Sequence, residues 1–540
     1  MKKIFVVEFG GTPSRTELCL LMNCGAGLYS DMDFTIYPLD KDIKSPNYVN
    51  SRDFCKDYQK VHRLTADGMF ATSGVIRRED LFEEVLKLAG IGKNRETIRN
   101  LVSDNGSLGA KGHMLLNLCF TEKEQYMDVE GGYYGRADIG AVTSRYLVHR
   151  KVYDSMGLVT DIERVLNEGG SGLDVVILCS SFGGTGASLG INFGEYLAER
   201  YRAQRNRLHL HCIHIQPYFS FPDPDDKDNW KIDCHEFYAK SASVVTAYGN
   251  KENFIRTVSE EEKNNPDTST GKNDYIFDSF YYLGQEVLDN VSDKNAARDE
   301  QQNDLHMIDM LVGMAIEDAV SRTRTDVGLQ LYSYLYSREG TGFLTWEHMK
   351  DSVRFKERHI SFARFCAFVL HVLKPLLDLE KEQYEAESLI VHMYGPVRKI
   401  SFSQRAKVRQ DVDDKFRGAL GPVFNFCRNY LIYWDQIEST TRHGGQDASI
   451  TRFFNKREIN RILNEKVSLE EGRERLHLEH LANSRGSKSY SAALSGGDVY
   501  DQLCKSNTLK LAAGEGKSGE AAASVLLQEI YRQCRLHMEE

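Results

Sequence analysis

The chain has 540 residues, of which 41% are hydrophobic and 27% are charged, a composition typical of globular proteins. The formal net charge of −10 argues against a protein that coats nucleic acid through phosphate contacts. With only 10 prolines and 43 glycines, the composition excludes a fibrous or mostly disordered chain, and the length predicts roughly two to four domains.

The cysteines and the apolar runs indicate a cytoplasmic protein. None of the 11 cysteines forms a C-x-x-C pair, which excludes a zinc ribbon or a thioredoxin-type site, and several lie inside apolar runs as buried thiols do. The first apolar run ends at Glu8, too early for a secretion signal. The longest run, 365–377, is interrupted by His371 and Lys374, so we expect no membrane span.

Strands and helices alternate along the first 345 residues. In chain order the pattern predicts a strand at 4–7, a helix at 14–23, a strand at 34–39, helices at 78–88 and 136–152, a strand at 173–179, a helix at 189–202, a strand at 208–215, a helix at 235–248, a strand at 275–283 and a long amphipathic core helix at about 302–321. This alternation predicts an α/β fold with a doubly wound, mostly parallel sheet.

The character of the sequence changes after about residue 345. Apolar residues recur with helical spacing from there to the end, so we expect two domains, 1–345 and a mainly helical region at 346–540. Two stretches of small and polar residues, about 483–498 and 513–519, are typical of mobile loops.

The most informative segment is the glycine-rich stretch that follows the predicted strand 173–179. It leads directly into a helix, so its backbone N–H groups and the positive end of the helix dipole can approach an anion. It lacks the Gly-Lys-Ser/Thr of a Walker loop and the G-x-G-x-x-G spacing of a dinucleotide-binding turn. The alternative is a tight turn with a purely structural role.

Four loops in sequence order resemble those of the tubulin and FtsZ superfamily. Residues 183–188, Gly-Gly-Thr-Gly-Ala-Ser, resemble its glycine signature, and residues 10–12 follow the first strand, where that family has its first nucleotide loop. Residues 131–140 resemble the glycine-rich loop of FtsZ, and 216–219 occupy the place of a proline-containing loop near the sugar. The resemblance covers about residues 1–350.

The resemblance implies a site for GTP, with Mg²⁺ bound through the nucleotide phosphates. The nucleotide-binding residues that it implies are Gly10, Gly11, Thr12, Gly135, Asp138, Gly183, Gly184, Thr185, Gly186, Ser188, Asn303 and Asp304.

Several of these assignments have structural alternatives. Asn303 and Asp304 suit the edge of a guanine base, but either could simply cap the core helix. Asp40 and Asp42 could hold Mg²⁺ through water, or could be ordinary turn residues. Arg136 and Arg145 are candidate phosphate contacts, or both are surface charges.

In this family the hydrolytic acids come from a neighbouring subunit. Residues 342–347 resemble the family's acid loop, which makes Glu347 and Asp351 the catalytic candidates. Lys350 stands where α-tubulin has its catalytic glutamate, and this departure weakens the prediction of hydrolysis. The alternative is that both acids only stabilise the first turn of a helix.

Three functions follow. The first is a prokaryotic GTPase that self-associates head to tail into filaments. The second is a nucleotide-binding scaffold or regulator on the same fold with little turnover, which recruits other proteins through its helical region in a stress or phage-defence system. The third is a Rossmann-type oxidoreductase, which the absence of G-x-G-x-x-G disfavours. His209, His211 and His214 of the predicted strand 208–215 are interpreted as buried, hydrogen-bonded side chains rather than zinc ligands.

Overall fold

The structure is a computed structural model. It describes residues 1–29, 31–40, 42–65, 70–90, 97–102, 110–129, 133, 135–170, 172–220, 234–249, 276–285, 288–290, 293–294, 302–321, 330–336, 344–380, 383, 386–394, 416–442, 449–482, 494–509 and 519–536.

A seven-stranded sheet forms the centre of the first part of the chain. The strands lie in the order β11-β7-β5-β4-β1-β2-β3, and every neighbouring pair is parallel. Their bounds are β1 Lys2–Phe9, β2 Met32–Leu39, β3 Val75–Arg77, β4 Leu173–Ser180, β5 Leu208–Ile215, β7 Ser279–Gln285 and β11 Gln330–Tyr336. The predicted α/β class with a parallel sheet is therefore confirmed.

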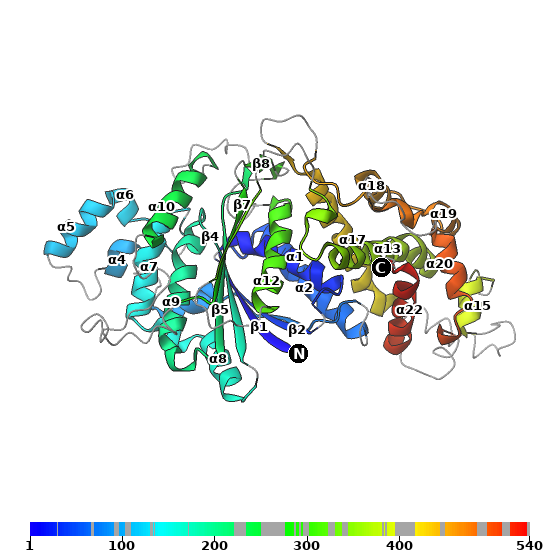
Figure 1. The fold of residues 1–540 in the computed structure, drawn as a ribbon, viewed down its shortest axis with the longest axis horizontal. Helices are drawn as coiled ribbons and strands as arrows, with labels where there is room; N and C mark the ends of the chain where they lie inside the picture. The colour runs from blue at the N-terminus through cyan, green and yellow to red at the C-terminus, as the bar shows by residue number, and fades with distance from the viewer. Residues whose placement is uncertain are drawn as a thin grey trace.

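Helices cover both faces of this sheet (Figure 1). One face packs against α1 Gly11–Gly25, α2 Pro46–Leu64 and α12 Met307–Ser321. The other packs against α3 Phe82–Leu88, α7 Ala137–His149, α8 Gly157–Asn167, α9 Ile191–Arg200 and α10 Phe237–Gly249, with the short helices α4 Ile98–Val102, α5 Ala110–Cys119 and α6 Glu122–Gln125 beyond α7. All eight residues of β4 are buried, as expected for a strand covered on both sides.

The region after residue 345 is largely helical, as predicted. It contains α13 Ser352–Phe368, the π-helical turn Val369–Leu373, α14 Lys374–Leu377, α15 Ser388–Tyr394, α17 Arg417–Ser439, α18 Lys456–Asn464, α19 Leu469–Arg475, α20 Gly496–Leu503 and α22 Gly519–Cys534.

The helical region and the sheet domain share one hydrophobic cluster. Phe54 of α2 stacks on Phe426 of α17 with ring centroids 4.4 Å apart, and Phe70 lies 4.8 Å from Phe365 of α13. A β-carbon on Gly25 would lie 2.8 Å from the Phe426 ring, so the two parts are in direct contact. Residue 345 therefore separates two kinds of secondary structure, but not two separate cores.

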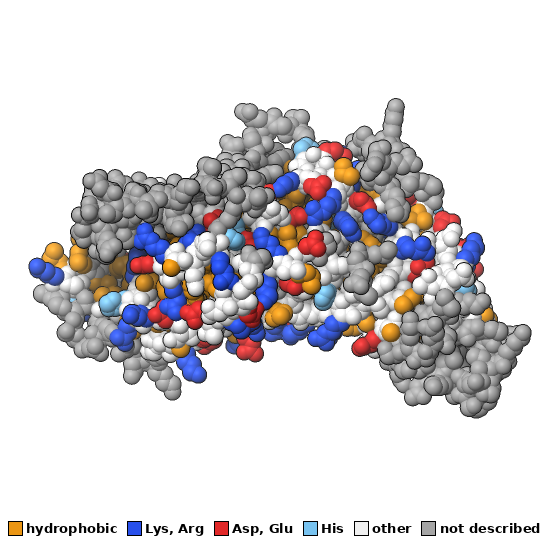
Figure 2. Space-filling view, turned by 60° about the horizontal axis from the view of Figure 1, so that its bottom comes forward, with side chains coloured by type: hydrophobic (Ala, Val, Ile, Leu, Met, Phe, Trp, Pro, Cys, Tyr) orange, Lys and Arg blue, Asp and Glu red, His pale blue; other side chains and the backbone are white. Residues whose placement is uncertain are grey.

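Within the described part of the chain, one helical stretch has the length and apolar composition of a membrane span. It runs through Ser352–Leu377, and 83% of its most apolar window is buried inside the molecule, as in core helices generally. The apolar run 365–377, which His371 and Lys374 interrupt, forms the second half of this stretch. Among the described side chains on the face shown in Figure 2, Lys and Arg are interspersed with Asp and Glu.

Several predicted boundaries differ from the structure. The core helix begins at Met307 rather than near residue 302, because Gln302–Asn303 pair with Asp293–Lys294 as short strands. The predicted helix 78–88 begins only at Phe82, after the unpredicted strand β3. Residues 494–498 are not a loop, since Ser495 caps α20, whereas 483–493 and 513–518 lie outside the described residues.

Candidate functional site

Two predicted nucleotide loops leave the sheet at the point where its strand order reverses. β1 and β4 are adjacent and parallel, and the strands after each one extend the sheet in opposite directions. In open α/β sheets, ligands bind in the crevice outside the carboxyl ends of the strands at such a switch point. The segments at 10–12 and 180–190 both start there.

Gly10 and Gly186 bring two helix N-termini together. Gly10 caps α1 with a φ of 85°, a left-handed backbone that favours glycine. A β-carbon on Gly10 would lie 3.4 Å from the backbone nitrogen of Gly186, in the helical segment after β4. Since each helix N-terminus presents backbone N–H groups and positive charge, the pair favours an anion such as a phosphate.

The loop after β4 also contacts the turn that precedes α7. A β-carbon on Gly184 would lie 2.6 Å from the β-carbon of Tyr133 and 3.2 Å from the backbone nitrogen of Gly135. One on Gly186 would lie 2.9 Å from the carbonyl oxygen of Phe9. The structure thus brings three predicted loops together at one place, and their glycines are needed for the close backbone approach.

The predicted hydroxyl groups differ in their surroundings. Ser188 is buried, and its Oγ donates a hydrogen bond to the carbonyl oxygen of Gly184 at 2.6 Å, so it stabilises the loop itself. Thr12 is half-buried at the start of α1, and Thr185 is 9% exposed beside Gly10. Thr12 and Thr185 are therefore better candidates than Ser188 for contact with a ligand.

Three carboxyl groups, here called the acid group (Glu8, Asp40 and Asp80), lie beside the first glycine loop. An oxygen of Asp40 would lie 3.3 Å from a β-carbon on Gly11. Asp80 accepts a hydrogen bond from the backbone N–H of Asp40 at 2.9 Å, and burial raises the pKa of Asp80 to about 6. Glu8 is 2% exposed; burial and the Glu17 carboxylate raise its pKa well above its usual value.

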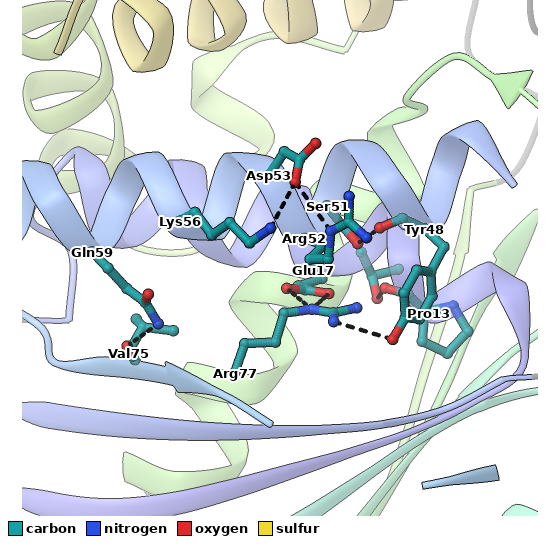
Figure 3. Close-up of polar contacts among 11 residues, drawn as sticks. Pro13, Glu17, Tyr48, Ser51, Arg52, Asp53, Lys56, Gln59, Val75 and Arg77 are labelled. Carbon is teal, nitrogen blue, oxygen red and sulfur yellow. Dashed lines mark hydrogen bonds and ion pairs between the residues drawn. The ribbon is translucent and has the colours of Figure 1, made fainter. Parts of the chain in front are cut away.

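Arg77 provides positive charge that acts on Glu8 of the acid group, since it opposes the rise in the pKa of that carboxyl. Figure 3 shows the contacts of Arg77 with Glu17 and Tyr48. Its Nε donates to both carboxylate oxygens of Glu17, at 2.9 and 3.1 Å. Its Nη1 donates to the Tyr48 hydroxyl at 3.2 Å, and the guanidinium carbon lies 4.5 Å from the centroid of that ring. The side chains of Glu17 in α1 and of Arg77 at the end of β3 are both buried, so their charges are fixed in place.

The acid group has the donor chemistry that Mg²⁺ requires. Mg²⁺ prefers oxygen ligands and keeps several of its waters. Neither oxygen of Glu8 has a hydrogen-bond partner among the described residues, so this buried carboxyl can accept from a water. Asp42, the other predicted residue, donates its backbone N–H to Asp40 at 3.3 Å and so orients that carboxylate.

Asn303, the predicted base-binding residue, belongs to a closed polar network. Its Oδ1 accepts hydrogen bonds from Arg15 at 3.2 Å and Asn47 at 3.4 Å, and its N–H donates to Asn47 at 3.1 Å. Arg15 also donates to the Tyr218 hydroxyl at 2.9 Å, and that hydroxyl donates to Asp309 at 2.6 Å. A purine that donates to the Asn303 Oδ1 would compete with the Arg15 guanidinium and the Asn47 amide for that oxygen.

Neither Asn303 nor Asp304 caps the core helix. The N–H groups at the start of α12 are bonded by other side chains, that of His306 by Asp309 at 3.0 Å and that of Ile308 by the His306 ring at 3.0 Å. Asp304 is half-buried and faces α17, where burial together with the Asp304 charge raises the pKa of Asp435.

A cavity of about 650 Å³ lies between α7, α9 and α10, next to the loop after β4. Gly135 and Asp138 line it together with Phe182. Asp138, a predicted nucleotide-binding residue, pairs with Arg136, the candidate phosphate contact, at 2.7 Å. The volume lies within the range typical of small-molecule sites. Phe182 separates this cavity from the Arg15 network, since its ring centroid lies 6.5 Å from that of Tyr218.

The predicted catalytic acids lie at the other end of the sheet. Glu347 is exposed in the turn Trp346–His348, where a hydrogen bond from Thr345 lowers its pKa. Asp351 precedes α13 with a φ of 49°. The neighbouring Lys350 pairs with Asp318 near the last turn of α12.

The direction of α12 shows how far the acids are from the glycine loops. Its C-terminal Val320 carbonyl accepts a hydrogen bond from Lys2, at the amino end of β1, whereas its first turn lies near Tyr218 at the carboxyl end of β5. Its 15 residues span about 22 Å. Within one chain, Glu347 and Asp351 therefore cannot reach the glycine loops.

His211 and His214 of β5 are buried and hydrogen-bonded, as predicted, whereas His209 is only half-buried. His211 bonds Asp174 at 3.0 Å and Ser279 at 2.7 Å, and burial lowers the pKa of His214 to about 3. His209 lies on the same strand, and the described residues place no metal-ligand group there.

Arg15, Asp80 and Glu8 are the site residues that sequence reasoning missed. A signal for two of them was present. Arg15 is a charged residue in a mostly apolar helix, and Glu8 interrupts the apolar run of β1. Such charges need a partner or a proton when they are buried.

No protein-family model matches the chain, and no curated protein matches it.

Proposed function

We propose that this chain is a tubulin/FtsZ-like GTP-binding protein with a doubly wound nucleotide domain. The observation that carries the proposal is the close packing of the two glycine loops at the topological switch point, where a β-carbon on Gly10 would lie 3.4 Å from the Gly186 nitrogen. Two helix N-termini meet there beside the acid group, so phosphates and a divalent cation find complementary charges within one small volume.

The residues at this site have distinct roles in the proposal. The N-termini of α1 and of the segment after β4 bind the phosphates, and Thr12 and Thr185 add hydroxyl donors. Asp40 holds Mg²⁺ through water, and the ion, when bound, neutralises phosphate charge. The free and mostly buried cysteines support a reducing, cytoplasmic compartment.

Hydrolysis in this proposal requires a second copy of the chain. Glu347 and Asp351 lie at the amino edge of the sheet, whereas the glycine loops lie at its carboxyl edge. Head-to-tail stacking would place the acids of one copy over the phosphates of the next, where they could polarise an attacking water. A contact between two different surfaces repeats without closing, which produces a filament.

One observation favours the second candidate function, a nucleotide-binding scaffold with little turnover. Lys350 stands where the resemblance implies an acid, and it is held by an ion pair with Asp318. A cation committed in this way supplies no general base. The extensive helical region then serves to recruit other proteins, in a stress or phage-defence role.

The binding site is tested by titrating fluorescent GTP, GDP and ATP analogues into the purified chain. Thr185→Asp puts a negative charge beside Gly10 and should weaken binding by about tenfold or more, equivalent to about 1.4 kcal/mol. Thr185→Val should weaken it less, and Thr160→Val, at an exposed position of α8, should leave it unchanged. Equal affinity of Thr185→Asp and the unaltered chain would refute the site, and binding of NAD⁺ alone would favour an oxidoreductase.

Turnover separates the two functions. For the filament-forming enzyme, GTP hydrolysis per chain should rise with protein concentration, together with GTP-dependent pelleting. The double variant Glu347→Ala, Asp351→Ala should then keep nucleotide binding and lose hydrolysis. Turnover that is absent, or unchanged in the double variant, would remove the catalytic role of both acids and leave the scaffold.

A further inference from the structure

Three metal-ligating side chains lie together in the helical region, away from the proposed nucleotide site. His477, Glu479 and His480 lie on or beside the 3₁₀ turn Leu478–His480, between α19 and α20. One ligand atom from each residue lies within 4.8 Å of those from the other two. Across the described residues, this is the one group of three or more His, Cys, Asp or Glu side chains with that property.

Two of the three separations between the ligand atoms are near those of a tetrahedral metal site, and the third is within 4.8 Å. Nδ1 of His477 lies 3.5 Å from Oε1 of Glu479, and Nε2 of His480 lies 3.9 Å from the same oxygen. Metal–ligand bonds of about 2.0–2.1 Å at tetrahedral angles require separations of about 3.3 Å. Small side-chain rotations close this difference, and all three side chains have room for them because none is fully buried.

The backbone that carries the three ligands is firmly held. Leu476, Leu478 and Leu481 alternate with them and are fully buried in the shared hydrophobic cluster. The Leu478 N–H donates to the Leu494 carbonyl oxygen at 2.8 Å, and the Leu478 carbonyl oxygen accepts from Arg364 at 3.3 Å. Apolar anchors therefore fix the turn so that its polar side chains project outward on one side, which is the support that a ligand set needs.

Glu479 is also oriented by a contact outside the group. Its Oε2 accepts a hydrogen bond from the backbone N–H of Leu494 at 3.1 Å, which leaves Oε1 directed between the two imidazoles. Carboxylates that bind a metal through one oxygen commonly have the other held in this way. The carboxylate also supplies negative charge at a site whose other two ligands are neutral.

We propose that His477, Glu479 and His480 bind a divalent transition metal ion, with zinc as the natural ligand. Two imidazole nitrogens and one carboxylate oxygen suit Zn²⁺, whereas Mg²⁺ and Ca²⁺ prefer oxygen ligands alone. The fourth position of the tetrahedron faces outward and takes a water or a donor from another molecule. The ion links the turn to the start of α20, because Glu479 already bonds Leu494, two residues before that helix.

The test uses the full chain without a polyhistidine tag, freed of metal with a chelator and titrated with Zn²⁺ and with Co²⁺. We expect one equivalent to bind, with the intense visible absorption of tetrahedral Co²⁺ and a rise in thermal midpoint on Zn²⁺ addition. His480→Ala and Glu479→Gln should weaken binding by about tenfold or more. His149→Ala, at an exposed histidine of α7, is the matched control and should bind normally.

Two results would overturn the proposal. One is that the double variant His477→Ala, His480→Ala, folded by circular dichroism, binds Co²⁺ with the same affinity and spectrum as the unaltered chain. The other is that the unaltered chain binds several equivalents weakly with octahedral spectra. Neither result depends on GTP, so the metal site and the proposed nucleotide site fail or succeed separately.

Discussion

Glu438 of α17 is a buried carboxyl group whose proton should make the stability of the protein depend on pH. Its Oε1 accepts the backbone N–H groups of Phe453 at 2.7 Å and Phe454 at 2.9 Å, and its Oε2 accepts from Thr451 at 3.2 Å. Burial nevertheless raises its pKa from 4.5 to about 7. The folded state therefore binds this proton more tightly than the unfolded state does.

The sign and size of the effect follow from that difference. With the folded pKa above the unfolded one, the stabilisation is fully present below about pH 4.5 and is lost as the pH rises through 7. A shift of about 2.5 pKa units corresponds to roughly 3 kcal/mol, since each unit is worth about 1.36 kcal/mol. Most of this loss, about 2.5 kcal/mol, should fall between pH 5 and pH 8.

Glu438→Gln should remove this loss. A glutamine oxygen can accept from Phe453 and Phe454, and its amide can donate to the Thr451 hydroxyl, which itself donates to the Ile437 carbonyl oxygen at 3.0 Å. The variant should become more stable than the unaltered chain as the pH rises from 5 to 8.

The assay is urea unfolding at several pH values. It is followed by tryptophan fluorescence, because Trp434 is fully buried one helical turn from Glu438. Other titrating groups are common to both proteins and cancel in the difference between them. A stability difference that stays constant between pH 5 and pH 8 would refute the assignment of this proton to Glu438.

Two further predictions concern the shared core and the Arg15 network. Phe426→Ala should lower the free energy of unfolding by about 3–5 kcal/mol, because it leaves a cavity against Phe54. Calorimetry should still show one unfolding transition for the whole chain. Two separate transitions would contradict the shared core. Arg15→Met should cost about 3–5 kcal/mol, because it leaves the buried Asp309 carboxylate without its cation 3.9 Å away. Adding Asp309→Asn to Arg15→Met should restore part of the lost stability. If urea unfolding shows that the two substitutions lower the free energy of unfolding by strictly additive amounts, the two side chains are not coupled.

The parts of the fold that the sequence predicts are those with strong local patterns. The strands 173–179 and 208–215 are continuous apolar runs, and the structure places β4 and β5 there with nearly the same bounds. The glycine loops are also visible locally, because a buried strand, a glycine turn and a helix follow one another within a few residues. Their convergence follows from the strand order, which parallel α/β sheets commonly adopt.

The parts that were missed depend on contacts between distant segments. α2 is unpredicted because its apolar side chains, such as Phe54, pack against α17 across several hundred residues, while its other positions are polar. The network at Asn303 depends on Arg15, 288 residues earlier. The local sequence pattern shows that Asn303 precedes a helix. The pattern carries no information about which side chains donate hydrogen bonds to the Asn303 Oδ1.

The shared core also limits how this protein can have evolved. α2 and α13 each present aromatic rings shaped to the other part of the molecule, so the helical region cannot be exchanged for another module in a single step. Each change on one side of that boundary must be matched by a change in volume on the other. Substitutions on the two sides of that boundary are therefore expected to be coupled in their effects on stability.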